Sequence, residues 1–339
     1  MTMKPVLKRA LAPLAATFIA TGAAAEPPRP LAPHLETHDT IGDLLANPAL
    51  AGFADRTLPW SGRQYDTTMK LDEIAVLLPY HSHIDPVTVV AGLNRLIDDA
   101  NAGRQVFYPV YPEAERRARR DLAEAGLFFF RGAPGAPFAV ISPGGGFSYV
   151  GSVHEGFPYA LEISRHGYNA FVLTYRTGQG GTEATRDLAA ALTFIFERAS
   201  DLEVSTEGYS LWGSSAGARM AASIGSHGAA AFGGADLPRP AAVVMAYTGH
   251  TAVTGDEPPT FVVVGEDDRI APAERMQRWV EALRAAGAAV EFHRFADLGH
   301  GFGPGIGTSA QGWIGEALRF WESAAPGGSE IGSRLQLDE

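Results

Sequence analysis

The sequence predicts an α/β fold, a mostly parallel central sheet with helices on both faces. Two observations support this prediction. From Leu127 onward, short apolar runs bounded by Gly, Pro or Asp alternate with longer helical segments. The apolar runs are short and rich in β-branched and aromatic residues, which is typical of buried strands. Repeated strand–helix units form parallel sheets, because each helix returns the chain to the edge where the previous strand began.

The individual elements follow from these patterns. Strands are predicted at 138–142, 170–175, 209–212, 242–246, 261–264 and 290–295. Helices are predicted at 154–166, 182–200, 216–226, 272–286 and 309–321. Sheets of this kind bind ligands at the carboxyl ends of their strands, so the residues that follow the strands are the candidates for chemistry.

The chain before this pattern has a different character. Residues 26–40 are rich in Pro and His and are predicted to form an extended linker, and residues 41–103 are predicted to be mostly helical. Asp85, followed by a proline, is a typical N-cap, so a helix is expected over 87–100. A further helix is expected over 112–125, where arginines and acidic residues predict a solvated, salt-bridged face.

The first residues have the pattern of an export signal. A positively charged start is followed by a mostly apolar run at 11–20 and by three alanines that end at Ala25. The apolar run is shorter than the roughly 20 residues of a membrane span, so no stable membrane insertion is expected. Cleavage near Ala25 predicts an exported, periplasmic protein, and an uncleaved amphipathic anchor is the alternative.

Together these features divide the chain into four parts. We expect a signal peptide at 1–25, and a linker with a helical extension at 26–104 that folds over the site as a cap. A catalytic domain is expected at 105–323, and a flexible tail at 324–339, where Pro-Gly-Gly-Ser occurs.

Composition excludes several classes of protein. The formal net charge of the 339-residue chain is −11, whereas nucleic-acid binding requires clustered Lys and Arg, so no nucleic-acid partner is expected. The chain has no cysteine, which excludes disulfides, thiolate metal sites and a cysteine nucleophile. With 46% hydrophobic and 19% charged residues, it is long and apolar enough to bury a full core.

The central chemical motif is Gly213-Ser214-Ser215-Ala216-Gly217, between a predicted strand and a predicted helix. This is G-x-S-x-G in the strand–turn–helix context that the motif requires. The turn is sharp, so the residues two places on either side of the nucleophile must be small. Ser215 is therefore predicted to be the nucleophile, and Ser214 shares the turn without the required spacing.

A serine hydroxyl needs a base, and the base needs an orienting acid. His300 follows the last predicted strand and is flanked by glycines, so it is the candidate base. Asp268 follows the preceding strand and is the favoured acid, in the chain order Ser, acid, His. Asp267 is its main competitor and Glu266 a weaker one.

Two further histidines lie near these strands. His293 is expected inside the last strand in a structural role, whereas His250 follows an earlier strand and is expected at most to line the pocket.

The tetrahedral intermediate of acyl transfer also needs hydrogen-bond donors for its oxyanion. Three glycines after the strand at 138–142 provide a backbone that can approach a substrate closely. The N–H groups of Gly145 and Gly146 are predicted donors, together with that of Ala216. A flexible glycine-rich turn is the alternative interpretation, and the joint occurrence of three matching loops weighs against it.

These residues resemble a known family. Pro143-Gly144-Gly145-Gly146-Phe147, the 213–217 elbow and Gly299-His300-Gly301-Phe302 are similar to the α/β-hydrolase esterases related to acetyl and acetylxylan esterases, including the hormone-sensitive-lipase-like branch. The resemblance covers residues 138–321, with Pro143 where histidine is common. It implies the α/β-hydrolase fold, hydrolysis of short-acyl esters, carbohydrate esters among them, and no cofactor.

Other residues are weaker candidates. Aromatic or polar residues near the glycine loop and the histidine are candidates to line the acyl or alcohol pocket, although each is equally compatible with ordinary packing: Phe147, Tyr149, His154, Glu155 and Phe302. His81, His83 and Asp85 alternate as metal ligands could, but a metal site needs three or four converging ligands, so a loop packed on the catalytic domain is the favoured interpretation and no metal is expected.

The sequence therefore predicts a serine esterase that forms an acyl-enzyme on a small-molecule or carbohydrate ester. A serine peptidase of the same fold is an alternative, because the same triad cleaves amides. A binding protein that has kept the fold and lost activity is another, which the intact set of motifs disfavours.

Overall fold

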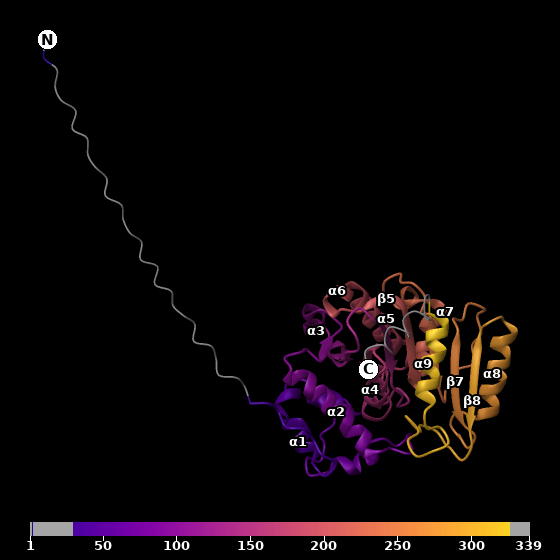
Figure 1. Ribbon diagram of the computed structural model, residues 1–339, viewed down its shortest axis with the longest axis horizontal. Helices are drawn as coiled ribbons and strands as arrows, with labels where there is room; N and C mark the ends of the chain where they lie inside the picture. Colours follow the sequence, from indigo (N-terminus) through magenta and orange to yellow (C-terminus); the bar gives the residue numbers. More distant parts are fainter. Residues whose placement is uncertain (1, 3–29, 326–339) are drawn as a thin grey trace. The chain divides into compact units, whose positions relative to one another are not determined.

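The computed structural model describes Thr2 and residues 30–325. Apart from Thr2, the predicted signal peptide lies outside these described residues, as do residues 326–339 of the predicted tail. Ala32 begins one compact unit that contains all the elements described below (Figure 1).

An eight-stranded sheet forms the centre of this unit, in the order β1-β2-β4-β3-β5-β6-β7-β8. From β4 to β8 neighbouring strands are parallel, whereas β1 and β2 pair antiparallel at one edge. The strands are β1 (Phe107–Pro109), β2 (Gly126–Phe130), β3 (Pro137–Ser142), β4 (Asn169–Thr174), β5 (Ser205–Ser214), β6 (Ala242–Ala246), β7 (Thr260–Gly265) and β8 (Val290–Phe295). The fold class predicted from the sequence is confirmed.

Helices connect the parallel strands. Right-handed crossovers place α4 on one face of the sheet and α5, α7 and α8 on the other, because the chain reverses its direction across the sheet after β4. Contacts between α4 and α9 add α9 to the first face. The bounds of these helices are α4 (Phe157–Arg165), α5 (Gly181–Glu197), α7 (Ala216–His227), α8 (Ala273–Ala285) and α9 (Trp313–Ala324), with the short α6 (Ala199–Leu202) after α5.

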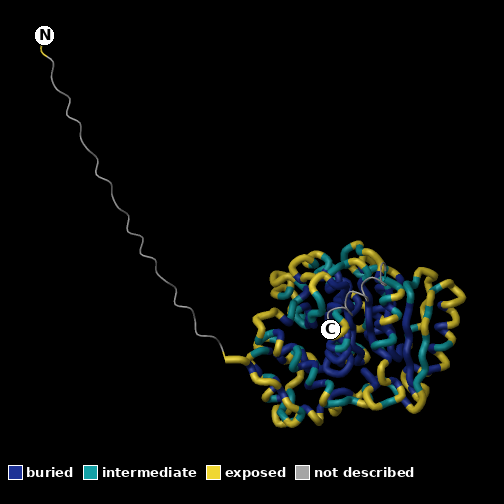
Figure 2. Tube along the Cα trace, in the orientation of Figure 1, coloured by how far each residue is buried: buried dark blue, intermediate teal, exposed yellow. Residues whose placement is uncertain are grey.

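The core follows from this layering. Strands β2, β3, β4, β6 and β7 are buried along their whole length, so both of their faces are covered (Figure 2). Their continuous apolar sequences are explained by this burial. Aromatic side chains join neighbouring strands, as where Phe129 of β2 stacks on Phe171 of β4 with ring centroids 4.2 Å apart.

The structure corrects the sequence prediction at the edge of the sheet and in the N-terminal part. The sequence prediction omits β1, whose three residues carry too little periodicity, and β2, which no helix separates from the next strand and which therefore falls outside the strand–helix repeat. The region 41–103 contains α1 (Ile41–Ala46) and α2 (Pro86–Asn101), joined by shorter helical pieces and turns rather than by further α-helices. Between them the helical pieces are 3₁₀ segments, because Pro48, Pro59 and Pro79 interrupt the hydrogen bonding of a helix.

Two helix predictions in this region have different outcomes. Asp85 caps α2 as expected, since its carboxylate accepts the N–H groups of Val87 and Thr88. The predicted helix over 112–125 is wrong in its length, because α3 (Glu113–Ala118) ends where Arg119 adopts an extended conformation. A 3₁₀ segment follows, in which Asp121 turns toward the buried Arg176 at 3.3 Å.

Candidate active site

Ser215 occupies a sharp turn between the end of β5 and the start of α7. Its φ of 49° lies in the left-handed region, which a non-glycine residue adopts only when its surroundings impose it. A hydrogen bond of 2.9 Å from the Ser215 N–H to the carbonyl of Ala246 helps to fix the turn. A methyl group on Gly213 would lie 2.5 Å from the backbone of Gly217, and one on Gly217 would collide with the carbonyl oxygen of Ser142. The two glycines are thus required by steric crowding.

The structure brings the side chains of Ser215, His300 and Asp268 into one hydrogen-bonded chain. His300 Nε2 lies 2.8 Å from Ser215 Oγ, and His300 Nδ1 lies 2.7 Å from Asp268 Oδ2. Because a carboxylate only accepts, Nδ1 carries the proton of the neutral ring, and Nε2 accepts from the serine hydroxyl. The other oxygen of Asp268 accepts the N–H groups of Ile270 (2.8 Å) and Ala271 (2.7 Å), which fixes the carboxylate.

The other acids and histidines lie elsewhere. Asp267 and Glu266 are exposed, and it is Asp268 that contacts His300. His293 lies within β8 and binds Glu291 at 2.7 Å, whereas the His250 ring packs against Trp279. Ser214 is buried, with its hydroxyl 3.2 Å from that of Tyr159.

The glycine loop after β3 lies next to the nucleophile. Gly145 and Gly146 have φ values of 134° and 63°, which explains why glycine stands at both positions. Their N–H groups donate to no backbone carbonyl within the described chain. Ala216 is the first residue of α7, and the first N–H groups of a helix have no partner inside it. These three N–H groups are therefore free to bind an anion.

The predicted pocket residues divide into two kinds. Phe147 is partly buried, and its ring lies beside Gly181 and Tyr175. The others are fully buried behind the loops, where they act on a ligand only through their neighbours: Tyr149, His154, Glu155 and Phe302.

Glu155 is a buried carboxylate directly behind the glycine loop. It accepts hydrogen bonds from the Gly144 N–H (2.5 Å) and the Tyr247 hydroxyl (2.7 Å), and its Oε1 lies 3.0 Å from His81 Nε2. Burial acts to raise the pKa of Glu155, but the charge and hydrogen bond of His81, with further help from His154 and Tyr247, outweigh it and lower the pKa to about 2. Glu155 is therefore ionised at neutral pH.

No local sequence pattern links these residues. Tyr247 directly follows β6, so its place at a strand end was a usable signal, but nothing local pairs His81 with Glu155 across 74 positions. His81, His83 and Asp85 do not point to a common metal site: His81 binds Glu155, His83 is exposed and Asp85 caps α2. In the described part of the chain, no three His, Asp or Glu side chains converge as metal ligands would.

The buried His154, next to Glu155 and His81, is expected to make the stability of the protein depend on pH. Burial lowers the pKa of His154 to about 4, and the neighbouring His81 adds to the effect. The ordinary value is about 6.5, so the unfolded chain binds a proton that the folded chain does not bind. The free energy of unfolding is expected to fall as the pH drops from about 6.5 to about 4, by up to about 1.4 kcal/mol per pH unit.

Urea unfolding of wild type and His154→Gln between pH 7 and pH 5 measures this contribution. The variant should show a shallower loss of stability toward pH 5, because glutamine does not titrate. His166→Gln, at an exposed histidine, should retain the wild-type slope. Equal slopes in wild type and His154→Gln would show that His154 is not held neutral by the fold.

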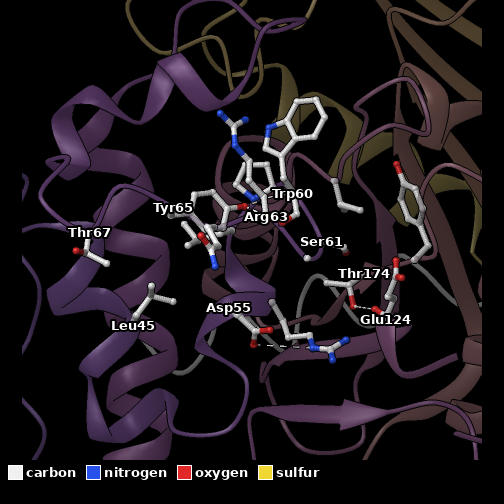
Figure 3. Close-up of a pocket in the computed structure, with 16 residues that line it drawn as sticks. Leu45, Asp55, Trp60, Ser61, Arg63, Tyr65, Thr67, Glu124 and Thr174 are labelled. Atoms are coloured by element: carbon white, nitrogen blue, oxygen red, sulfur yellow. Dashed lines mark hydrogen bonds and ion pairs between the residues drawn. The ribbon is translucent and has the colours of Figure 1, made fainter. Parts of the chain in front are cut away.

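A groove of about 470 Å³ lies between the N-terminal segment and the end of β4 (Figure 3). Its lining includes Trp60, Arg63, Gln64 and Glu124, and the triad residues are not among the lining residues. Val150, a few residues after the glycine loop, also lines the groove, and its N–H donates to the Pro59 carbonyl at 2.9 Å.

The strand order, the nucleophile turn and the aligned Ser–His–Asp chain define the class of protein: the chain has the α/β-hydrolase fold. Among the described residues, none of the helices combines the length and apolar character needed to cross a bilayer.

Comparisons with known proteins agree with this class. The prolyl oligopeptidase family matches residues 242–325, about a quarter of the chain, including Asp268 and His300. No curated protein sequence gives a significant match.

Solved structures of similar fold include an acetyl ester-xyloside bifunctional hydrolase from Caldicellulosiruptor lactoaceticus. It has a TM-score of 0.55 and 20% identity, with 64% of this chain and 95% of that chain covered. The α/β hydrolase MGS-M1 from a Medee basin deep-sea metagenome library has a TM-score of 0.51 and 24% identity, with 59% and 92% covered. A thermophilic esterase from Thermogutta terrifontis has a TM-score of 0.50 and 19% identity, with 59% and 87% covered. Likeness at these identities establishes the fold.

Proposed function

We propose that this protein is a serine hydrolase that cleaves carboxylic esters through an acyl-enzyme. The observation that carries the proposal is the alignment of Ser215, His300 and Asp268, with distances of 2.8 Å and 2.7 Å between the successive pairs. Free N–H groups beside the serine and a helix that begins at the next residue support the same chemistry.

The reaction follows from these positions. Ser215 Oγ attacks the ester carbonyl carbon while His300 Nε2 takes the hydroxyl proton, and Asp268 orients the ring. The N–H groups of Gly145, Gly146 and Ala216 bind the oxyanion of the tetrahedral intermediate. The intermediate collapses with cleavage of the carbon–oxygen bond, and His300 gives its proton to the leaving alcohol. Water, deprotonated by His300, then releases the acid and regenerates the serine.

A serine peptidase is the second candidate, because the prolyl oligopeptidase family matches the segment that carries Asp268 and His300. The same triad can cleave an amide, and the assay decides between the bonds. Purified enzyme is offered nitrophenyl acetate and butyrate in one series and proline-containing peptide nitroanilides in the other. Faster turnover of the esters, with preference for acetyl, supports the esterase. Faster turnover of the peptides would overturn it.

Labelling by a fluorophosphonate probe separates both enzymes from an inactive binding protein of the same fold. An active serine hydrolase reacts with the probe at Ser215, and a chain that remains unlabelled under conditions that label a control esterase would contradict the proposal.

We further propose a short acyl group and a carbohydrate alcohol as the natural substrate. The similar solved structure of an acetyl ester-xyloside hydrolase supports this choice. The groove that Val150 lines also suits an uncharged polar ligand. Its lining carries two arginines and two acids, so their formal charges cancel, and it includes the aromatic Trp60 (Figure 3).

Tyr80 is the residue we expect to contact the sugar. Tyr80 is 44% exposed, although its ring stacks on that of Tyr149 with the centroids 5.7 Å apart. A methyl group on Gly146 would lie 3.1 Å from the Tyr80 ring, and one on Gly301 would lie 2.5 Å from the Tyr80 carbonyl oxygen. Tyr80 therefore borders both the oxyanion loop and the His300 loop, where the leaving alcohol would sit.

Tyr80→Ala is expected to raise KM for acetylated xylo-oligosaccharides about 10-fold, which corresponds to about 1.4 kcal/mol of lost contact. KM for nitrophenyl acetate should change much less, because acetate esters of small alcohols do not reach as far. Val87→Ala, which also removes an exposed apolar side chain, is the control. Equal changes for both substrates would show that Tyr80 does not recognise the alcohol.

Export to the periplasm is also proposed, on the charged, apolar and small-residue pattern of residues 1–25. Mass spectrometry of the protein from its native cells should find a chain that begins near Glu26. A chain that still begins at Met1 would contradict export by cleavage.

A further inference from the structure

Glu155 lies at the junction of the loops that carry the proposed reaction. It is fully buried, and a buried carboxylate is costly unless hydrogen bonds and an opposing partner compensate it. Three groups compensate the carboxylate: the Gly144 N–H, the Tyr247 hydroxyl and the His81 imidazole. Each group belongs to a different part of the site.

The first group, the Gly144 N–H, belongs to the glycine loop, which carries the proposed oxyanion donors. Gly144 immediately precedes the proposed donors Gly145 and Gly146, and its N–H is held by Glu155 Oε2 at 2.5 Å. Gly144 also abuts the nucleophile, since a methyl group on it would lie 3.0 Å from Ser215 Cβ. A shift of Glu155 would therefore move the donors relative to the serine.

The second group, the Tyr247 hydroxyl, contacts the loop that carries the proposed general base, His300. Tyr247 donates its hydroxyl to Glu155 and accepts the Gly303 N–H at 3.2 Å. Its ring also lies edge-on against His300, with the centroids 5.1 Å apart. Glu155 thus fixes, through Tyr247, the segment that follows His300.

The third group, the His81 imidazole, belongs to the N-terminal segment. The His81 side chain is almost completely buried, and its Nδ1 lies 2.8 Å from the Tyr149 hydroxyl. The next residue, Ser82, donates its N–H to the Gly301 carbonyl and its hydroxyl to the His300 carbonyl, both at 2.9 Å. Residues 81–82 therefore support two loops. They hold the glycine loop through Glu155, and they bind the loop that carries His300 directly.

We propose that His81 is a positioning residue for catalysis. It holds the Glu155 carboxylate against Gly144 and Tyr247, so that the oxyanion donors and His300 keep their places around Ser215. The N-terminal segment then completes the active site instead of only covering it. This inference rests on the proposed hydrolase function.

The expected kinetic effect is specific. Oxyanion donors act on charge that develops in the transition state, so their misplacement lowers kcat and leaves KM nearly unchanged. His81→Ala is expected to lower kcat for nitrophenyl acetate about 30-fold, less than the roughly 100- to 1,000-fold cost of deleting a donor. KM should stay within about twofold, because the displaced groups bind the ground state weakly.

Chemical rescue separates positioning from general destabilisation. His81→Ala leaves an imidazole-sized space beside Glu155, so millimolar imidazole should restore part of the lost kcat, whereas it should not activate the wild type. Glu155→Gln should lower kcat similarly and should not respond to imidazole. His83→Asn, at the exposed histidine two residues away with φ of 52°, is the matched control, because asparagine tolerates that backbone conformation.

The outcomes are distinct. Unchanged kcat in folded His81→Ala would overturn the proposal, and so would a loss of kcat that imidazole does not restore. If His81→Ala does not fold, His81→Gln, which retains an N–H donor, is compared instead, and wild-type kcat in that folded variant together with wild-type kcat in Glu155→Gln would overturn it. A wild type that neither hydrolyses esters nor reacts with the fluorophosphonate would refute the hydrolase function itself, before any variant is compared.

Discussion

Ser215→Ala is expected to lower kcat for nitrophenyl acetate by about 10⁶-fold, the largest effect of any single substitution in this chain. The reason is that alanine removes the only atom that forms the acyl-enzyme, while His300 and Asp268 keep their places without a nucleophile to activate. The residual rate comes from the oxyanion donors acting on water. Burst and steady-state kinetics measure the loss, and circular dichroism verifies that the variant is folded.

The neighbouring serine provides the matched control. Ser214→Ala removes a hydroxyl that is 3.2 Å from the Tyr159 hydroxyl, so it is expected to cost about 1 kcal/mol of stability and to retain most of the activity. Activity that survives Ser215→Ala but not Ser214→Ala would show that Ser214 is the nucleophile and would contradict the assignment of Ser215. Activity that survives both substitutions would remove the serine mechanism.

Asp268→Asn is expected to have the second largest effect, a fall in kcat of about 10³- to 10⁴-fold. One oxygen of Asp268 accepts the N–H groups of Ile270 and Ala271, so the asparagine carbonyl will keep that position. Its NH₂ group then faces His300 Nδ1 and stabilises the tautomer in which Nε2 carries the proton. That ring cannot accept the proton of Ser215.

Asp267→Asn tests whether the adjacent acid shares this role. Asp267 is exposed, whereas Asp268 is buried against His300 at 2.7 Å. We expect Asp267→Asn to retain kcat within about twofold, since an exposed side chain without contact to the base contributes little to orienting it. A loss in Asp267→Asn equal to that in Asp268→Asn would mean that the loop rearranges during catalysis and that the observed contact is not the working one.

Much of the fold could be predicted because it depends on local patterns. The strands predicted at 242–246 and 290–295 have the observed bounds, since short runs rich in β-branched and aromatic residues and bounded by Gly or Pro are typical of strands. The antiparallel strands β1 and β2 are not predicted, because β1 has three residues and no helix separates β2 from the next strand, so neither belongs to the strand–helix repeat. The helix predicted over 112–125 failed for a similar reason, since Arg119 breaks it and Asp121 pairs with a distant arginine.

The candidate site shows the same division. The order of Ser215, Asp268 and His300 along the chain, each just after a strand, could be read from the sequence, because parallel strands end at one edge of the sheet. The choice between Asp268 and Asp267 needed the structure, since adjacent residues in a loop point in different directions. From the sequence, Glu155 is only a polar residue near the glycine loop, because its burial depends on segments that are distant along the chain.

By itself, the sequence determined which chemical groups this protein has and at which strand ends they lie, because strand periodicity, glycine at crowded turns and the order of motifs are properties of neighbouring residues. Only the tertiary structure decided which distant groups meet. His81 reaches Glu155 at 3.0 Å, and Ser82 binds the loop of His300 across 218 positions. Such contacts depend on how the N-terminal segment packs against the sheet, and packing is set by burial and shape over the whole unit rather than by any local pattern.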